Sequence, residues 1–288
     1  MIEGVTQNIA WYFFLAGAGS GAFMLHALIS TFAPHIPPRL TAASPITSPI
    51  ISPLASICLV LAGSFFLLAD LGVPELFYLA VLNLKHSVIS FGILAIALFV
   101  SFAAAYVLAI ARRKTRTGAL LAPAFKWLAF AAALATASYT GYYLFSMESV
   151  DLWTSPFVIP LFLASSLSTG AAALMMTTAL EHPARRRDHI KRLCRTDSAL
   201  IVAETLALAA FVASRFLAGG DALALLLEML VGSHALLFWV GVVGAGLVAP
   251  LVCERLLLKG VGDDALAIIT AACVLAGGLA LRCSIILV

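Results

Sequence analysis

Eight apolar stretches, each about 20 residues long, restrict the fold of this chain more than any other feature of its sequence. A helix needs about that length to cross the hydrocarbon core of a bilayer. Because lipid offers the backbone no hydrogen bonds, the stretches must be helical. They lie at roughly 9–33, 53–72, 86–110, 124–146, 156–180, 199–218, 227–252 and 265–287. The sequence therefore predicts an all-α integral membrane protein with eight transmembrane helices.

The composition supports a membrane protein and argues against several other classes. The chain is 62% hydrophobic and 11% charged, whereas a soluble domain carries about 25% charged residues. So few charges cannot cover a surface that faces water, so membrane lipid must cover it. The basic residues form clusters in loops on one membrane face, which argues against a nucleic-acid partner.

The basic residues also set the topology. Lys and Arg crowd alternate connections between the apolar stretches, above all at 112–126 and 185–195. Lys85, Arg215 and Arg282 are the exceptions, at the opposite ends of their spans. Because Lys and Arg stay on the cytoplasmic side, both termini are predicted to be extracytoplasmic. The connection at 34–53 holds six of the twelve prolines and is expected to be an extended cytoplasmic loop.

Two segments resemble each other and suggest a duplicated architecture. Residues 14–20 open the first span and residues 162–168 open the fifth, each with aromatic or leucine residues followed by small ones. Small residues let helices pack closely in lipid. We expect two four-helix bundles, at 1–150 and 151–288. The general richness of membrane helices in small residues would explain the similarity equally well.

Polar residues at the outer ends of the spans suggest a site there. Asn8 and Trp11 share one helix face, although Trp11 also suits an interfacial aromatic belt. Asp70 ends the second span, where a carboxylate is costly unless it is solvated or paired. It is either a solvated helix end or a group that exchanges protons with a lipid-borne substrate, facing Lys85 or His86.

Tyrosines at the outer end of the fourth span are candidate ligands for a quinone. A quinone carbonyl needs a hydrogen-bond donor in an apolar slot, and a tyrosine hydroxyl meets that need. Tyr139 and Tyr142 are the two candidates, of which we expect one to touch the ligand. The alternative is that both belong to the aromatic belt.

Three charged residues in the second half are candidates for a proton path. Glu204 lies within the sixth span, about one turn from its cytoplasmic end, where it either leads to water or reaches toward the basic loop. Arg215 and Arg282 lie near the outer ends of spans six and eight. They pair with Asp221 or Glu228, or they anchor helix ends.

The chain lacks the pattern of a redox cofactor. Its five cysteines are scattered with no Cys-x-x-Cys, so we expect no iron–sulfur cluster and no metal site. A haem needs two histidines at one depth on facing helices. Only His86 and His234 share the outer third, and the duplicated arrangement puts them in different bundles. We therefore expect no haem.

Five motifs, taken in order, resemble those of the NrfD-like membrane subunits, the family of the polysulfide reductase anchor. They are W-Y-F-F-L-A-G-A-G-S-G-A-F at 11–23, A-D-L-G-V-P-E-L-F at 69–77, S-V-I-S-F-G at 87–92, Y-T-G-Y-Y-L-F at 139–145 and W-T-S-P-F-V-I-P-L-F-L-A-S-S-L-S-T-G at 153–170. The resemblance covers about residues 8–180. The last three spans match through length and topology.

This resemblance implies the membrane anchor of a multi-subunit oxidoreductase in a bacterial or archaeal cytoplasmic membrane, of the kind used in anaerobic respiration. Such anchors bind menaquinone or ubiquinone near the extracytoplasmic face. They exchange electrons with a ferredoxin-like subunit that carries [4Fe–4S] clusters, often beside a molybdopterin catalytic subunit. The family's quinone pocket maps to Asn8, Asp70 and Tyr139 or Tyr142. Trp11 replaces a histidine that some relatives have, and Val73 replaces a common arginine.

Two functional hypotheses follow. In the first, a quinone enters from lipid between spans 1 and 4, tyrosine and Asn8 hold its carbonyls, and Asp70 or His86 exchanges protons with the outer medium. The chain has no electron carrier of its own, so electrons pass to a cluster in a partner. The second hypothesis is a proton or solute transporter, although such proteins usually place charge at the midplane.

Overall fold

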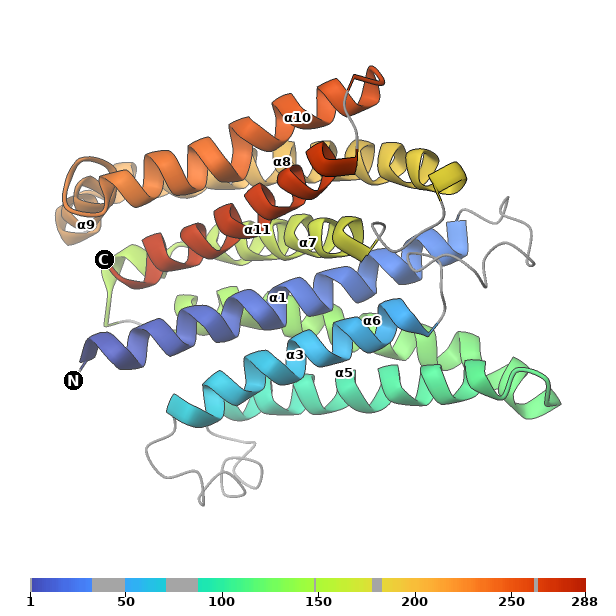
Figure 1. Cartoon of the computed structure of the whole chain (residues 1–288). Helices are drawn as coiled ribbons and strands as arrows, with labels where there is room; N and C mark the ends of the chain where they lie inside the picture. The colour runs from blue at the N-terminus through green and yellow to red at the C-terminus, as the bar shows by residue number, and fades with distance from the viewer. Residues whose placement is uncertain (1, 33–49, 71–87, 148, 178–182, 262–263) are drawn as a thin grey trace.

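The computed structural model of the chain describes residues 2–32, 50–70, 88–147, 149–177, 183–261 and 264–288, without the side chains of 2–6, 70 and 183–189. It is helical in these ranges, and eight of its helices are long and apolar enough to cross a membrane (Figure 1). The prediction of eight spanning helices is confirmed. The predicted loop at 34–53 lies outside the described residues, apart from its end, where a helix already begins at Ile51.

The described helices divide between the two halves of the chain. The first half contains α1 (Ile2–Phe32), α3 (Ile51–Asp70), α5 (Val88–Ala111) and α6 (Arg116–Phe145). The second half contains α7 (Val158–Thr177), α8 (Pro183–Ala218), η4 (Leu237–Val248), which continues directly as α10 (Ala249–Leu258), and α11 (Asp264–Ile286). Two short helices, η2 (Asp151–Thr154) and α9 (Gly220–Val231), complete the described elements.

Three spans begin eight or more residues away from the predicted start. The fourth span begins at Arg116 rather than 124, because Pro123 lies inside α6 without ending it. The sixth begins at Ile190 rather than 199, so Glu204 lies about four helical turns from that end and not one. The seventh begins at Leu237 rather than 227, because residues 227–231 belong to the separate, amphipathic α9.

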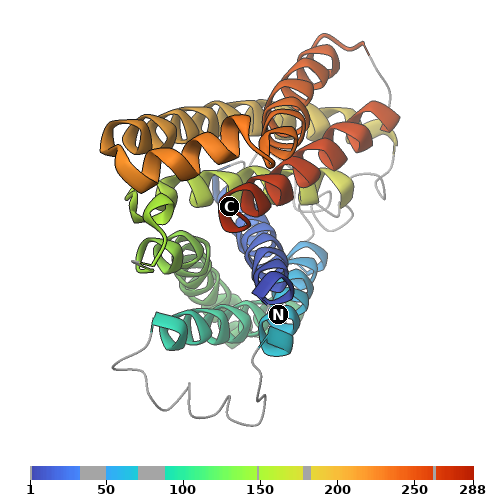
Figure 2. The same ribbon diagram turned by 90° about the vertical axis from the view of Figure 1, so that its left-hand side faces the viewer.

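Helix α1 joins the two halves of the molecule. It packs against α3 and α6 on one side and against α7 and α11 on the other (Figure 2). A Cβ added at Gly21 would lie 1.8 Å from the backbone oxygen of Ser166, and one at Gly170 would lie 2.3 Å from the amide nitrogen of Ala22. Only glycine allows backbones this close. The two similar segments, 14–20 and 162–168, therefore lie on helices that touch, and the division into bundles at 1–150 and 151–288 stays a prediction.

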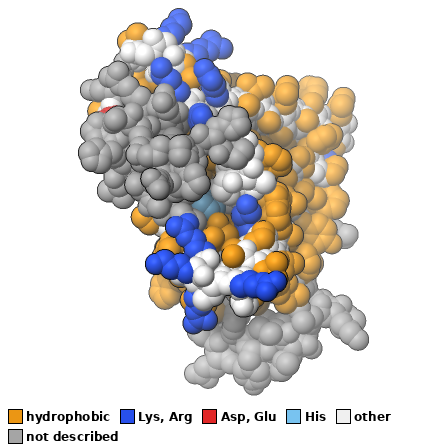
Figure 3. All heavy atoms as spheres, turned by 90° about the vertical axis from the view of Figure 1, so that its right-hand side faces the viewer, with side chains coloured by type: hydrophobic (Ala, Val, Ile, Leu, Met, Phe, Trp, Pro, Cys, Tyr) orange, Lys and Arg blue, Asp and Glu red, His pale blue; other side chains and the backbone are white. Residues whose placement is uncertain are grey.

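The two ends of the molecule differ in charge. Both chain termini, η2 and α9 lie at one end, which we call the terminal end (Figure 1). Lys and Arg gather at the opposite end, the basic end, including residues 112–116 between α5 and α6 (Figure 3). Between the ends, large apolar side chains such as Leu108 and Leu206 are exposed, as expected where lipid covers the protein. Which end faces the cytoplasm stays a prediction from the positive-inside rule.

Candidate functional site

Three tyrosines from two helices meet near the terminal end of the first half. Tyr139 and Tyr143 of α6 have ring centroids 5.9 Å apart, and the phenols of both act electrostatically on Tyr12 of α1. Phe91 of α5 packs against Tyr139, with centroids 6.1 Å apart. A Cβ on Gly92 would lie 2.2 Å from the Tyr139 ring. Glycine at 92 therefore makes room for Tyr139 in what we call the tyrosine cluster, Tyr12, Tyr139 and Tyr143.

The hydroxyl of Tyr12 is the unusual group of this cluster. The Tyr12 side chain is 1% exposed and Tyr139 is 4% exposed. Within the part of the chain that the structure describes, the Tyr12 hydroxyl has no hydrogen-bond partner. Buried polar groups are nearly always satisfied, because leaving one unpaired costs about 1–3 kcal/mol. Among the described residues, this phenol is therefore a donor left free in an aromatic surrounding.

Two of the predicted polar residues lie at one level along the helices α1 and α3. Trp11 of α1 stacks on Phe66 of α3, with ring centroids 6.1 Å apart. Because α1 and α3 run in opposite directions, Asn8, about one turn before Trp11, comes level with Asp70, about one turn after Phe66. Asn8 is partly buried. The side chain of Asp70 and the whole of His86 lie outside the described residues.

The two alternative tyrosines have different surroundings. Tyr142 is 46% exposed and lies on the outer surface of the helix assembly, whereas Tyr139 is enclosed by α5 and by Tyr143. A donor for a buried carbonyl must be held inside the protein. The prediction that one of the pair contacts the ligand therefore narrows to Tyr139, although the contact itself stays a prediction.

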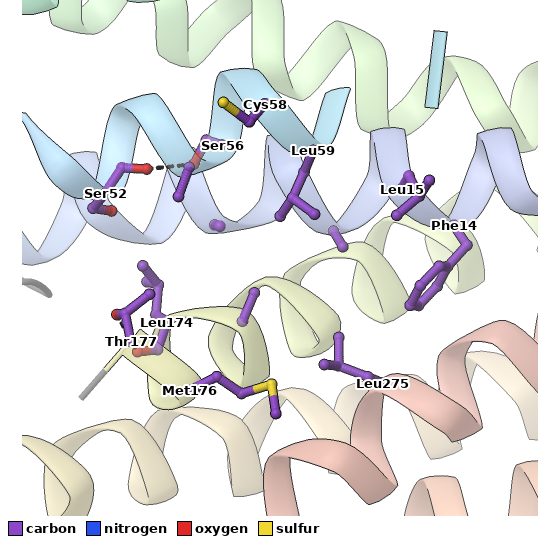
Figure 4. Close-up of a pocket in the computed structure, with 14 residues that line it drawn as sticks. Phe14, Leu15, Ser52, Ser56, Cys58, Leu59, Leu174, Met176, Thr177 and Leu275 are labelled. Atoms are coloured by element: carbon purple, nitrogen blue, oxygen red, sulfur yellow. Dashed lines mark hydrogen bonds between the residues drawn. The ribbon is translucent and has the colours of Figure 1, made fainter. Parts of the chain in front are cut away.

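An apolar pocket of about 470 Å³ opens elsewhere, between α1 and α3 on one side and α7 and α11 on the other (Figure 4). Leu15, Leu59, Leu174, Met176 and Leu275 are among its lining residues. Its polar groups are the hydroxyls of Ser52, Ser56 and Thr177, and Cys58 is its one titratable residue. This lining suits a hydrocarbon chain and does not suit a group that exchanges protons during a reaction.

Arg282 is fully buried at the junction of the two halves. Its guanidinium donates to the hydroxyls of Ser165 at 3.1 Å and Ser166 at 3.2 Å, and to the carbonyl of Gly278 at 2.7 Å. It also lies over the rings of Phe14 and Phe162, 5.8 and 5.6 Å from their centroids. Its Nε has no partner among the described residues. A charge placed this deep in a membrane protein usually marks a functional or pairing role.

The other two predicted proton-path residues lie apart from each other. Glu204 is buried, within hydrogen-bonding reach of Ser165 and close enough to Arg282 for their charges to interact. Arg215, in contrast, donates to the carbonyl of Asp151 at 2.9 Å and to the Thr154 hydroxyl at 2.8 Å. It holds η2 at the terminal end. Of the three residues, only Glu204 and Arg282 belong to one polar group.

Sequence reasoning missed three buried polar residues, Tyr12, Asp197 and Glu254, and the partly buried Tyr143. Tyr12 was interpreted, together with Trp11, as part of an aromatic belt at the membrane interface. Adjacent residues of a helix point to different faces, and this was the available signal that Tyr12 points elsewhere than Trp11. Asp197 and Glu254 fall outside the predicted spans, since the sixth was expected to begin at 199 and the seventh to end at 252. Tyr143 shares a helix face with Tyr139, which is the available signal for the cluster.

Metal ligation finds no support in the described ranges, where no group of three or more His, Cys, Asp or Glu side chains is arranged to hold an ion. His234 illustrates this: its Nδ1 lies 3.0 Å from the hydroxyl of Ser233 in an exposed turn. The buried polar groups considered for the site are therefore the tyrosines of the first half and the carboxyls of the second.

Comparison with known proteins covers almost the whole sequence. The family described as polysulphide reductase, NrfD, matches residues 6–288. The C chain of polysulfide reductase from Wolinella succinogenes is 27% identical over 296 residues, an alignment that covers 95% of this protein and 90% of that one. Both matches include the helices that carry the tyrosine cluster and those that carry Arg282.

Proposed function

The chain belongs to the NrfD family of polysulphide reductase membrane subunits, and from that membership we propose that it exchanges electrons between menaquinone or ubiquinone and an extracytoplasmic [4Fe–4S] subunit. The family supplies the membrane subunit of an oxidoreductase. The finer statement, that this chain binds the quinone itself at the tyrosine cluster, rests on the geometry of its own residues.

The unpaired hydroxyl of Tyr12 carries this proposal. It is buried beside Tyr139 in an apolar surrounding. A quinone carbonyl in that position could accept a hydrogen bond from this hydroxyl, which donates to no described protein group. Asn8 and Asp70 lie level with each other on the adjoining helices. A ring held by tyrosine hydroxyls would therefore lie against the helix that carries Asn8.

The reaction requires proton exchange as well as binding. Each quinol that is oxidised releases two protons and two electrons. Asp70 and His86, at the terminal end, are the residues we assign to proton exchange with the extracytoplasmic medium. The electrons pass to the cluster of the iron–sulfur subunit, which we place against the terminal end, together with a molybdopterin catalytic subunit.

The membrane orientation belongs to the same proposal. Lys and Arg gather at the basic end, and basic residues are retained in the cytoplasm. Both termini then face the outside of a bacterial or archaeal cytoplasmic membrane, with the tyrosine cluster in the outer leaflet. Glu204 and Arg282 remain candidates for a proton path in the second half, whereas the contacts of Arg215 with η2 favour a role in anchoring it.

Conservative replacements test the site. We expect Tyr12→Phe and Tyr139→Phe each to lower kcat/KM for quinol in the purified complex at least about tenfold, because each removes one hydrogen bond to the ring. Tyr12→Phe should leave the melting temperature unchanged or raise it, since its hydroxyl has no partner to lose within the described protein. Asp70→Asn should lower turnover by about 10² or more, because a proton-exchanging group is lost.

Tyr142→Phe is the matched control, since Tyr142 lies on the same helix but is 46% exposed. Its turnover should equal that of the unmodified protein. Normal quinol turnover in both Tyr12→Phe and Tyr139→Phe would reject the tyrosine cluster as the ring site. A large fall for Tyr142→Phe would place the site at the exposed side of α6, where Tyr142 lies.

A transporter without a redox role is the alternative function. Eight spanning helices with buried charges in the second half are compatible with it. Isolation from the native membrane separates the two: a redox anchor brings an iron–sulfur protein with it, detectable by its absorption and iron content. Isolation of the chain alone, with vesicles that show solute-driven proton uptake, would favour the transporter.

A further inference from the structure

We propose that Asp197 and Glu254 form a proton-binding site in the second half of the molecule, in which the two carboxyls share one exchangeable proton. Asp197 lies on α8 and Glu254 on α10, two helices that pack against each other. Both side chains have no exposed surface. That the pair binds a proton does not depend on the proposed quinone reaction. A coupling of this proton to quinone oxidation would rest on the proposed function.

Two serines fix the orientation of the carboxyls. The hydroxyl of Ser168 on α7 donates to Oδ1 of Asp197 at 2.7 Å. The hydroxyl of Ser198, which follows Asp197 on α8, donates to Oε2 of Glu254. Each carboxyl thus has one oxygen held by a serine of a neighbouring helix, so its second oxygen points in a defined direction.

The second oxygens carry the argument. Oδ2 of Asp197 and Oε1 of Glu254 are buried and accept no hydrogen bond from any described residue. The two side chains are nonetheless within hydrogen-bonding reach of each other. Two ionised carboxylates contain only acceptors, so they cannot bond to each other and would leave two buried like charges together. One proton between them satisfies both oxygens and removes one of the charges.

A metal cation suits the site less well than a proton. Hard cations such as Ca²⁺ or Mg²⁺ take about six oxygen ligands, whereas the described residues offer two free carboxylate oxygens here. The serine hydroxyls already direct their hydrogens at the carboxyls. The proton is the occupant that these contacts satisfy.

The pair lies on the same side of α8 as another buried carboxyl, that of Glu204. Asp197 lies seven residues, or about two turns, from Glu204 on α8, toward the basic end. Ser165, beside Glu204, and Ser168, beside Asp197, are about one turn apart on α7. Among the described residues, the pair is close enough to interact electrostatically with Cys194, and Asp197 with Glu204, both on α8. The site therefore lies between the basic end and the Glu204–Arg282 group.

Infrared spectroscopy of the full chain, in the complex in which it is isolated, tests the proposal. A protonated carboxyl gives a C=O stretch that shifts in D₂O and disappears when the proton is lost. We expect one such band to titrate in the unmodified protein and to be absent in both Asp197→Asn and Glu254→Gln, because the introduced amide donates to the remaining carboxylate. Glu204→Gln and the exposed Asp221→Asn should retain it.

A second measurement does not depend on the variants folding. The melting temperature of the unmodified complex should fall as the pH rises through the loss of this band, since two buried negative charges then face each other. An unchanged band in both Asp197→Asn and Glu254→Gln would overturn the proposal. So would a band that Na⁺ removes at constant pH, which would make the pair a cation site. The band should persist in Tyr139→Phe, so a failed quinone site and a failed proton site give different results.

Discussion

The two halves of the molecule bury different kinds of side chain. In the first half, the described interior near the terminal end is aromatic, and Tyr12, Tyr139 and Tyr143 gather in it. In the second half, five charged side chains are buried: Asp197, Glu204, Arg215, Glu254 and Arg282. The described first half buries no Lys, Arg, Asp or Glu. Among the described residues, the interior of one half is thus aromatic near the terminal end, whereas that of the other half holds charge.

This difference is physically reasonable for one protein with two tasks. A quinone ring is apolar with two carbonyls, so an aromatic slot with phenol donors binds it without the cost of burying ions. Buried ions in a membrane are expensive unless they pair or exchange protons. Under the proposed function, their concentration in the second half would separate proton handling from ring binding. The predictions below test that separation, from the largest expected effect to the smallest.

The contact that joins the halves should be the most sensitive to change. In Gly170→Ala the new Cβ would lie 2.3 Å from the backbone nitrogen of Ala22, so α1 and α7 must move apart. We expect a loss of about 3 kcal/mol or more in the free energy of unfolding. Gly244→Ala is the control, because its nearest neighbour is the Trp239 carbonyl at 3.3 Å. Equal melting temperatures for the two variants in detergent would mean that the halves are not held by this crossing.

Replacement of the buried Arg282 should have the next largest effect on stability. Arg282→Met loses the hydrogen bonds to Ser165 and Ser166 and leaves the buried Glu204 without its nearest described positive charge. We expect about 3 kcal/mol of destabilisation in thermal unfolding.

The double variant Arg282→Met with Glu204→Gln sharpens the comparison. If charge balance is what Arg282 provides, neutralising Glu204 should restore part of the lost stability, as a double-mutant cycle would measure. The exposed Arg255→Met should change stability by no more than about 0.5 kcal/mol. A fully additive cycle would show that Arg282 acts through packing against Phe14 and Phe162, and the second half would then not be organised around charge.

A surface carboxyl should matter least. Glu228 of α9 accepts hydrogen bonds from the hydroxyl and backbone N–H of Ser233, and these hold its pKa below the usual value. The stabilisation is present above the ordinary pKa of a glutamate and is lost as the pH falls through the lowered value. The melting temperatures of the unmodified protein and Glu228→Gln should therefore differ slightly at neutral pH and converge in acid. A difference in melting temperature that grows as the pH falls would mean that the pKa of Glu228 is raised rather than lowered by folding.

Much of the architecture could be predicted from the sequence. Length and apolarity sufficed for eight spanning helices, and the order of motifs identified the family, which the match to residues 6–288 confirms. The errors were at helix ends. Pro123 and the charges at 195–197 looked like boundaries, although α6 and α8 continue through them. Asp197 and Glu254 were missed for that reason, since a residue placed in a loop is assumed to be solvated.

The candidate site was predicted only in part. Tyr139, Glu204 and Arg282 stood out because a polar residue in an apolar span is conspicuous, and all three are buried in the structure. Tyr12 was not conspicuous beside Trp11, and Tyr142 was as good a candidate as Tyr139. The choice between such neighbours depends on which face of a helix meets another helix, which a sequence with apolar residues on every face does not reveal.

By itself, the sequence determined that this chain spans a membrane eight times, which end of the helices is basic and which family it belongs to, because hydrophobic length, loop charge and motif order are local properties. Tertiary structure alone decided which polar groups meet. The crossing at Gly21 and Gly170, the unpaired hydroxyl of Tyr12 and the facing carboxyls of Asp197 and Glu254 each depend on contacts between helices far apart in the sequence. In lipid, where every face of a helix is apolar, packing geometry carries that information.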